Sequence, residues 1–113
     1  MTYEIKIYGE IVPFQGTQIE NRGYTNLSIV EDQLKKAGGS ELLVKLHTVG
    51  GDVDEGFAIY ASLRRYAKDH HVKITTRADG QVASIGTVIF LAGDESKFIT
   101  GTTQVIDGGM CAG

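Results

Sequence analysis

Short apolar segments alternate with longer segments of helical periodicity along most of this chain, and this alternation restricts the folds that the sequence can adopt. Strand character is clear in Tyr3 to Val12, in Leu42 to His47 and in Val72 to Thr76. Between them, the stretches Leu27 to Leu34 and Asp52 to His70 carry apolar residues at helical spacing. Because strands that alternate with helices form parallel sheets covered by helices, we expect an α/β fold.

Turn and capping residues mark the ends of these segments. Asn26 or Ser28 can cap the first helix, and Gly38-Gly39 can end it. The segment from Ala78 to Ala83 contains Gly80 and is predicted to be a turn. The remaining predicted elements are a buried helix over residues 84–92 and short strands over residues 98–100 and 102–106.

The size and charge of the chain exclude several classes of protein. Its 113 residues fit one domain over residues 1–113. The net charge is −3 and no basic cluster exceeds two residues, so no nucleic-acid surface is expected. No apolar run reaches the ~18 residues of a membrane helix, and no secretory signal is visible. The single cysteine, Cys111, excludes an internal disulfide, so we expect a reducing, cytoplasmic location.

Two glycine-containing junctions each follow a predicted strand and lead into a predicted helix. The first runs from Leu46 to Asp52 and contains Gly50 and Gly51. The second runs from Gly80 to Gly86 and contains Ser84. Ligands of parallel α/β sheets bind at the carboxyl ends of strands, and glycines there leave backbone N–H groups accessible. Two such turns on neighbouring strands can direct N–H donors at one oxygen, which is the arrangement of an oxyanion hole.

Each of these features also has a purely structural interpretation. Ser84 stands where its helix begins, so its hydroxyl either caps that helix or projects as a nucleophile at the positive end of the helix dipole. A phosphate site at the first junction is not expected, because Asp52, Asp54 and Glu55 would repel phosphate. We interpret these acids as helix stabilisers, since no histidine or cysteine completes a metal-ligand set. Neither a metal nor another cofactor is expected.

The same residues resemble a known family. The matching stretches are Ile7 to Ile11, Val49 to Tyr60, Gly80 to Gly86 and Leu91 to Asp94. In order and spacing they resemble the proteolytic subunit of the Clp protease family, especially the phage-type members that process viral heads. The resemblance implies a truncated fold of ClpP/crotonase-type βα units and peptide-bond hydrolysis through an acyl-enzyme at Ser84. It also implies that the N–H groups of Gly51 and Ile85 form the oxyanion hole, with Gly50 shaping the turn.

The chain departs from the family pattern in ways that bear on activity. The family places a general-base histidine on the strand after the serine helix, whereas this sequence has no histidine after His71. A serine without a base is a weak nucleophile near neutral pH. His47 ends the neighbouring predicted strand and is the conceivable substitute, while His70 and His71 end the long helix at the opposite sheet edge. The family's later aspartate and its oligomerising handle would lie beyond Gly113, and Val49 replaces the usual proline of its turn.

The C-terminal segment, residues 88–110, resembles a different family. It is similar to the end of short-chain dehydrogenases/reductases, in which a helix, an Ile-Thr-Gly turn and a last strand ending in Asp-Gly-Gly follow one another. The glycine-rich nucleotide loop and the Tyr-x-x-x-Lys pair of that family are absent from the sequence, so dehydrogenase activity is not expected. A chimera, natural or engineered, joined between Val88 and Asp94 would explain both resemblances. This hypothesis predicts that Thr103 to Ile106 forms a strand parallel to Val72 to Thr76.

The sequence leaves three functions open. The first is a ClpP-like serine endopeptidase domain, weakly active or inactive because its triad is incomplete, with a peptide or protein as its substrate. The second is a non-catalytic structural or engineered α/β scaffold, and the third is an acyl-CoA-binding relative of the crotonases. Without the family's handle, ring assembly and docking of an ATPase are not expected, although an exposed strand edge would support weak self-association.

Overall fold

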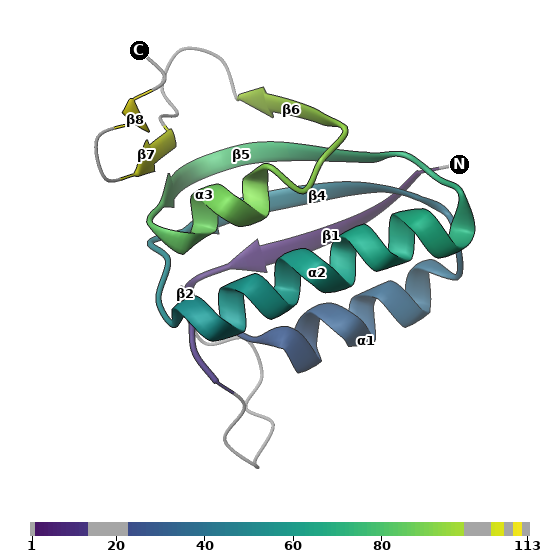
Figure 1. The fold of residues 1–113 in the computed structure, drawn as a ribbon, viewed down its shortest axis with the longest axis horizontal. Helices are drawn as coiled ribbons and strands as arrows, with labels where there is room; N and C mark the ends of the chain where they lie inside the picture. Colours follow the sequence, from purple (N-terminus) through teal and green to yellow (C-terminus); the bar gives the residue numbers. More distant parts are fainter. Residues whose placement is uncertain (1, 14–22, 99–104, 108–109, 112–113) are drawn as a thin grey trace.

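The computed structural model describes residues 2–13, 23–98, 105–107 and 110–111. Its strands are β1 (Thr2–Tyr8), β2 (Glu10–Ile11), β3 (Tyr24–Thr25), β4 (Glu41–Thr48), β5 (Ile74–Ala83), β6 (Glu95–Phe98), β7 (Val105–Asp107) and β8 (Met110–Cys111). Its helices are α1 (Leu27–Ala37), α2 (Val53–His70) and α3 (Ile85–Phe90), as Figure 1 shows.

The larger sheet has the strand order β1-β4-β5-β7-β8, with β6 also paired to β5. β1 pairs with β4, and β4 with β5, in parallel ladders in which Ile5 lies opposite Val44 and Leu42 opposite Ile74. β6 and β7 run parallel to β5, and β8 runs antiparallel to β7. This order confirms the predicted α/β fold with a mostly parallel sheet covered by helices.

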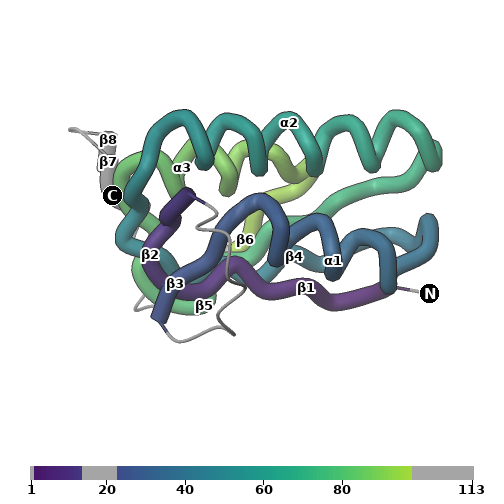
Figure 2. The backbone as a smooth tube through the Cα atoms, turned by 90° about the horizontal axis from the view of Figure 1, so that it is seen from below, coloured from purple at the N-terminus to yellow at the C-terminus, as the bar shows by residue number. Residues whose placement is uncertain are grey.

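The helices pack on one face of this sheet, and Figure 2 shows α2 above β1 and β5. Side chains alternate along β4, so that Leu42, Val44 and Leu46 are buried in the core whereas Lys45 and His47 face the more exposed side. Fully buried core residues from other elements include Ile5, Ile7, Val30, Ile59, Leu63, Ile74 and Ile89. Among the described residues, no helix combines the length and apolar character of a membrane span.

Local capping residues fix the ends of the two longer helices. The Asn26 side chain accepts a hydrogen bond from the Ile29 N–H over 3.0 Å, so Asn26 rather than Ser28 caps α1. Gly38 ends α1 in the left-handed conformation, as predicted. The Asp52 carboxylate accepts the Glu55 N–H over 2.8 Å at the start of α2. The prediction that Asp52 begins a helix ending near His70 is therefore confirmed.

The predicted continuous strand from Tyr3 to Val12 is wrong, because the chain breaks direction at Gly9. Gly9 has φ +95°, and its N–H donates to the His47 carbonyl over 2.8 Å. A Cβ at this position would lie 2.5 Å from the carbonyl carbon of Gly23, which leaves room for glycine only. Beyond this break β2 leaves the larger sheet and pairs with β3.

The predicted turn from Ala78 to Ala83 is also wrong, because β5 runs through it to Ala83. Leu46 pairs with Ala78, and Thr48 pairs with Val82, so three residues of β5 lie opposite one residue of β4. Residues 79–81 therefore form a bulge, here called the β5 bulge. The glycine that suggested a turn is a bulge residue, and the true strand-to-helix turn begins at Ser84.

The C-terminal strands occupy successive parts of one edge of β5. β6 begins at Glu95, earlier than predicted, and pairs with residues 75–78 of β5. β7 pairs in parallel with Val82 and Ala83, at the opposite end of β5 from the predicted partner segment Val72 to Thr76. The predicted direction is right for β7, but its register is wrong because β6 already fills the earlier position. Residues 99–104 lie outside the described residues, so the strand expected over 98–100 is described only at Phe98.

A side chain of α1 covers part of the outer edge of β1. The Gln33 amide nitrogen donates to the Lys6 carbonyl over 2.9 Å, and its oxygen accepts the Lys6 N–H over 2.8 Å. One side chain therefore makes both of the hydrogen bonds that a neighbouring strand would make at this residue.

Candidate active site

The turn between β4 and α2 is held by hydrogen bonds on either side of Gly51. Gly50 O accepts the Ile11 N–H over 2.8 Å, and the Asp52 N–H donates to Ile11 O over 2.8 Å. In a parallel bridge of this kind, the residue between the two bonded neighbours directs its own N–H and C=O away from the partner. The Gly51 N–H is therefore directed away from Ile11 and takes no part in this bridge.

The backbone of this turn requires glycine at two successive positions. Gly50 has φ +95° and Gly51 has φ +146°. A Cβ on Gly51 would overlap the Ile11 carbonyl oxygen, and one on Gly50 would lie 2.8 Å from the Ala83 carbonyl oxygen. The Thr48 hydroxyl accepts a hydrogen bond from the Gly50 N–H over 3.0 Å and so helps to fix the turn. The glycine pair thus allows close approach to β2 on one side and to the end of β5 on the other.

Ser84 lies in a strained turn between β5 and α3. Its φ of +56° and ψ of −132° are unusual for a residue with a side chain, and such conformations cost about 1–3 kcal/mol. Ser84 occupies the capping position of α3, but its side chain makes no capping hydrogen bond. The hydroxyl is exposed and has no hydrogen-bond partner within the described part of the chain. The capping interpretation therefore gives no account of its side chain.

The two glycine-containing junctions lie against each other. A Cβ on Gly50 would stand 2.6 Å from the Ser84 Cβ and 3.2 Å from its Oγ, so the first junction packs directly against the serine. Ile85 is the first residue of α3, and the N–H groups of a first helical turn have no acceptor inside their own helix. The structure thus brings Gly50 and Ser84 together, with Gly51 and Ile85 as their immediate chain neighbours.

The histidines are engaged elsewhere. His47 Nδ1 accepts the Gln81 N–H over 3.0 Å, and His70 packs against Tyr66 with ring centroids 4.5 Å apart. His71 ends α2, whose 18 residues span about 27 Å, so His70 and His71 lie at the opposite sheet edge, as predicted. No hydrogen bond joins a histidine to Ser84 within the described ranges, so none of the three histidines activates the hydroxyl in this conformation.

A charged cluster next to His47 was not predicted from the sequence. Asp79 accepts hydrogen bonds from the Tyr8 hydroxyl over 2.7 Å and from Arg77 Nε over 2.6 Å. Burial, together with the hydrogen bond to Asp79, raises the pKa of Tyr8 to about 12. For Asp79, burial opposes ionisation, but the bonds from Arg77 and Tyr8 outweigh it and lower the pKa. Tyr8 comes from β1, whereas Arg77 and Asp79 come from β5, so no local sequence signal could have joined Tyr8 to Asp79.

The acidic residues at the start of α2 have structural partners. Asp52 caps α2, and the Glu55 carboxylate accepts the Leu27 N–H of α1 over 2.7 Å, which ties the two helices together. Asp54 is exposed. Among the described residues, no group of histidine, cysteine or acidic side chains is arranged to hold a metal.

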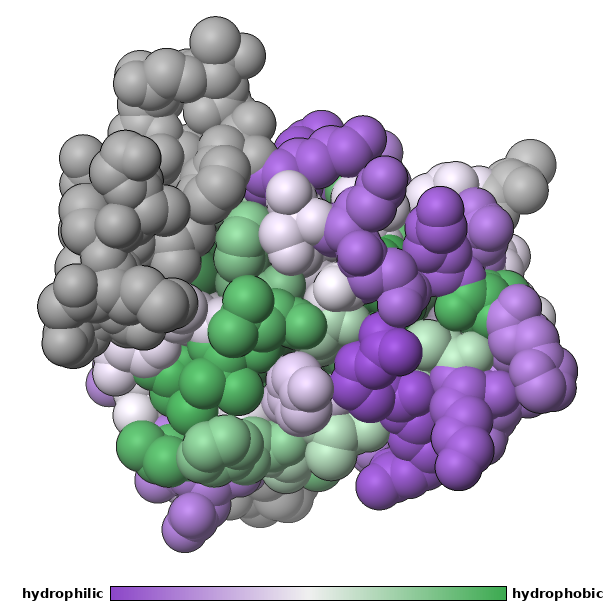
Figure 3. All heavy atoms as spheres, turned by 45° about the horizontal axis from the view of Figure 1, so that its top comes forward, coloured by the Kyte–Doolittle hydropathy of each residue, from purple (hydrophilic) through white to green (hydrophobic). Residues whose placement is uncertain are grey.

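Apolar side chains gather on the surface beside this site. Figure 3 shows this area on the helix-covered part of the molecule, and the exposed apolar residues include Val53 and Phe57 on α2 and Leu91 at the end of α3. A hollow of about 220 Å³ opens at the same edge of the sheet and includes His47, Val49 and Gln81 among its lining residues.

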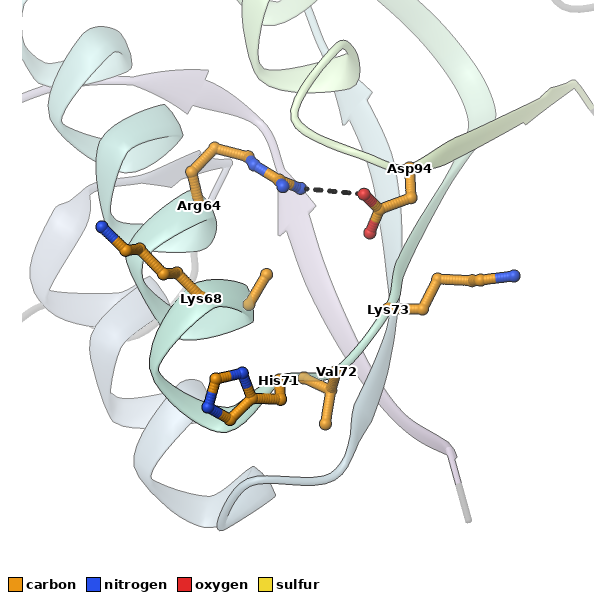
Figure 4. A pocket seen from close by; sticks show the side chains of 7 residues that line it. Arg64, Lys68, His71, Val72, Lys73 and Asp94 are labelled. Atoms are coloured by element: carbon orange, nitrogen blue, oxygen red, sulfur yellow. Dashed lines mark hydrogen bonds and ion pairs between the residues drawn. The ribbon is translucent and has the colours of Figure 1, made fainter.

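A larger hollow, of about 740 Å³, lies at the opposite edge of the sheet. Figure 4 shows Arg64 reaching toward Asp94, 3.4 Å away, while Lys68 and Lys73 extend outward on different sides. The other carboxylate oxygen of Asp94 accepts the Ile74 N–H over 2.8 Å. The acid and the arginine are therefore engaged with each other and with the backbone, and the lysines do not converge on a common point.

The sequence model of the Clp protease family matches residues 7–107. The chain belongs to the Clp protease family. In fold, it is similar to a mutant of ClpP1 from Listeria monocytogenes, with a TM-score of 0.62 and 22% sequence identity. That alignment covers 92% of this chain and 55% of the ClpP1 chain, so this chain spans about half the length of that protein. No match is found among curated proteins.

The family match also includes most of the C-terminal segment. It extends to residue 107, through β6 and β7, and so covers most of the segment 88–110 that was predicted to resemble a different family. Neither a chimeric origin nor a dehydrogenase-like tail is shown by these comparisons. The family assignment therefore applies to the sheet as far as β7.

Proposed function

We propose that this chain is a ClpP-like serine peptidase domain in which Ser84 is the nucleophile. The N–H groups of Gly51 and Ile85 would bind the oxyanion that forms when the Ser84 Oγ attacks a peptide carbonyl carbon. The peptide C–N bond then breaks, the amine leaves with a proton, and water later releases the acyl group from the serine. The substrate class is an extended peptide or protein segment.

The observation that carries this proposal is the hydroxyl of Ser84, which lies in a strained turn and has no hydrogen-bond partner among the described residues. A serine with only a capping role would donate or accept a bond within its own helix, yet Ser84 makes no capping bond and keeps a φ of +56°. Strain of this kind concentrates at functional sites, where it exposes the side chain at a strand-to-helix turn. The direction of the Gly51 N–H away from Ile11 supports the oxyanion role.

The proposed activity is weak in this chain. Within the described residues, Ser84 has no hydrogen bond to a histidine, so its hydroxyl proton must pass to water when the oxygen attacks. An oxyanion hole by itself still accelerates such a reaction, because its donors stabilise the charge that develops. We therefore expect slow acylation of Ser84 and little turnover of peptides.

An activity-based probe tests the nucleophile directly. A fluorophosphonate should form a bond between Ser84 Oγ and phosphorus, with fluoride as the leaving group and the hydroxyl proton released to water. Intact-mass and peptide mass spectrometry should place the adduct on Ser84. Ser84→Ala should abolish it, whereas Ser28→Ala, a serine of α1 away from the site, should leave the labelling rate unchanged.

The contrary outcome has a clear meaning. If the folded chain takes no label at Ser84 over long exposure, or takes it equally at Ser28, acylation is refuted and the non-catalytic α/β scaffold becomes the better account. Circular dichroism of each variant separates this result from loss of folding. An acyl-CoA-binding function is not favoured by any contact of the described residues.

The assembly and location of the protein are further proposals. Weak self-association is proposed through the exposed apolar residues Val53, Phe57 and Leu91, and light scattering across a concentration series would measure it. The cytoplasmic location, the single domain over residues 1–113 and a natural or engineered join within α3 stay predictions. Ring assembly and ATPase docking are not part of the proposed function.

A further inference from the structure

We propose that His47 is a positioning residue whose neutral imidazole holds the β5 bulge in place, so that acid loosens the turn that presents Ser84. The effect on the bulge stands on the contacts of His47 alone. Its bearing on Ser84 rests on the proposed function.

The tautomer of His47 follows from its partner. Nδ1 lies 3.0 Å from the backbone nitrogen of Gln81, which can only donate. Nδ1 must therefore be the unprotonated acceptor, and the ring proton of the neutral imidazole resides on Nε2. Protonation would place an N–H on both ring nitrogens, so that Nδ1 and the Gln81 nitrogen would face each other as two donors.

The bulge is shaped around this imidazole. A Cβ on Gly80 would overlap His47 Nδ1, so the ring fills the space that a side chain would occupy there. β4 and β5 lose their regular pairing at this point, between the Leu46 and Thr48 positions. The Gln81 N–H bonds to a side chain where a regular ladder would supply a backbone carbonyl. His47 therefore substitutes for the missing ladder contact of the bulge.

The distance in sequence between the bulge and the serine is short. Two residues, Val82 and Ala83, separate Gln81 from Ser84. Val82 is fully buried and paired with Thr48. The backbone between the bulge and the turn therefore has little freedom to absorb a displacement of Gln81. A strained φ at Ser84 persists only while the surrounding backbone holds it. Release of Gln81 is therefore expected to reach the Ser84 turn.

The charges around His47 come from three strands. Tyr8 of β1 lies edge-on to the ring, with centroids 5.8 Å apart, and stays neutral because its pKa is raised to about 12. In the β5 bulge region, Asp79 is paired with Arg77, so the two charges largely cancel. Glu10 of β2 lines the same hollow. The bond from the Gln81 N–H to Nδ1 is the contact that a proton on Nδ1 would remove.

The test follows backbone amides by NMR between about pH 8 and about pH 5, the interval in which histidines change charge. In the wild-type protein, the Gln81 amide shift should follow the imidazole signal of His47 with the same midpoint, and the Ser84 and Ile85 amides should follow it. The protection factor of Gln81 against hydrogen exchange should fall about three- to tenfold in the acid form, as expected for the loss of one hydrogen bond.

Two variants separate the acceptor from the charge. In His47→Asn the side-chain oxygen can occupy the position of Nδ1 but does not titrate, so the Gln81 amide should be protected and independent of pH. In His47→Leu the acceptor is lost, and Gln81 should resemble the acid form of the wild type throughout. A Gln81 amide that ignores the His47 titration, or that titrates equally in His47→Asn, would overturn the proposal.

A separate readout distinguishes this proposal from the proposed function. The ratio of Ser84 labelling rates, wild type over His47→Asn, should fall about three- to tenfold from about pH 8 to about pH 5. A ratio that stays constant while Gln81 titrates would refute the link to Ser84 and leave the peptidase proposal intact. If Ser84 takes no label at any pH but Gln81 titrates as expected, the peptidase proposal fails and the role of His47 in the bulge is supported.

Discussion

The two edges of the parallel sheet use their polar groups in opposite ways. At the amino edge of β5, both carboxylate oxygens of Asp94 are bonded, one to Arg64 and one to the Ile74 N–H. Nearby, the Tyr66 hydroxyl donates to the Ser40 carbonyl over 2.7 Å. At the carboxyl edge, Ser84 keeps an exposed hydroxyl without a partner within the described residues and a backbone conformation that costs energy.

This contrast shows why the larger hollow is not the better candidate site. Its polar groups are already committed to holding α2 and the strands together, and the wider opening at that edge adds no free donor or acceptor aimed at a common point. The carboxyl edge encloses less volume, yet it combines strain with an uncommitted hydroxyl and adjacent glycines. A candidate active site needs polar groups that are not already engaged in holding the fold together. Among the described residues, the Ser84 hydroxyl at the carboxyl edge is such a group.

The largest expected effect concerns the glycine turn. Gly51→Ala places a Cβ against the Ile11 carbonyl oxygen at φ +146°, so we expect a loss of about 3 kcal/mol or more in the free energy of unfolding, or no folding at all. Urea denaturation followed by circular dichroism measures this loss.

Gly23→Ala is the matched control for that substitution. Gly23 also has a positive φ, +86°, but a Cβ there would meet nothing within 4 Å. Only backbone strain should remain, at about 1 kcal/mol. Equal losses in the two variants would show that contact with Ile11 is not what restricts position 51.

A smaller effect is expected at the amino edge. Asp94→Ala removes the acceptor of the Ile74 N–H and the partner of Arg64, so the free energy of unfolding should fall by about 1–2 kcal/mol. Asp69→Ala, an exposed acid of α2, should change it by less than about 0.5 kcal/mol. The Ser84 labelling rate should be the same in both variants. A changed rate in Asp94→Ala would mean that the two edges are not independent.

The smallest expected effect is the pH dependence of the Asp79 cluster. Because the folded protein lowers the pKa of Asp79, its contribution is fully present above the ordinary aspartate range near about 4 and is lost as the pH falls through the folded pKa. At about pH 7 the free energy of unfolding of the wild type should exceed that of Asp79→Asn by up to about 1 kcal/mol. The difference should shrink at about pH 3. A difference that stays constant between these two pH values would contradict this assignment.

The parts of the fold that could be predicted depend on local chemistry. The caps of α1 and α2 involve residues three positions apart in sequence, so the local sequence was enough to predict Asn26 and Asp52 at the starts of these helices. The parallel sheet followed from alternation of strands and helices. The proximity of Gly50 to Ser84 followed in turn, because parallel neighbouring strands end at the same edge.

The parts that could not be predicted depend on register between distant strands. Gly9 ends β1 because the backbone of Gly23 passes beside it, and Gly80 belongs to a bulge because His47 lies across from it. The Tyr8–Asp79 bond joins residues 71 positions apart. Predicting any of these contacts requires the register between distant strands, and neither residue propensity nor periodicity specifies that register. The lack of a capping bond at Ser84 likewise depends on the conformation of its turn, which the sequence pattern does not specify.

The amide of Gln33 on the outer edge of β1 bears on how copies of this protein meet. A bare strand at the margin of a sheet invites another chain to extend the ladder, the first step of uncontrolled polymerisation. Here an incoming strand would have to evict a side chain that already satisfies both backbone groups of Lys6. At Lys6, lateral growth of the sheet therefore requires displacement of the Gln33 amide.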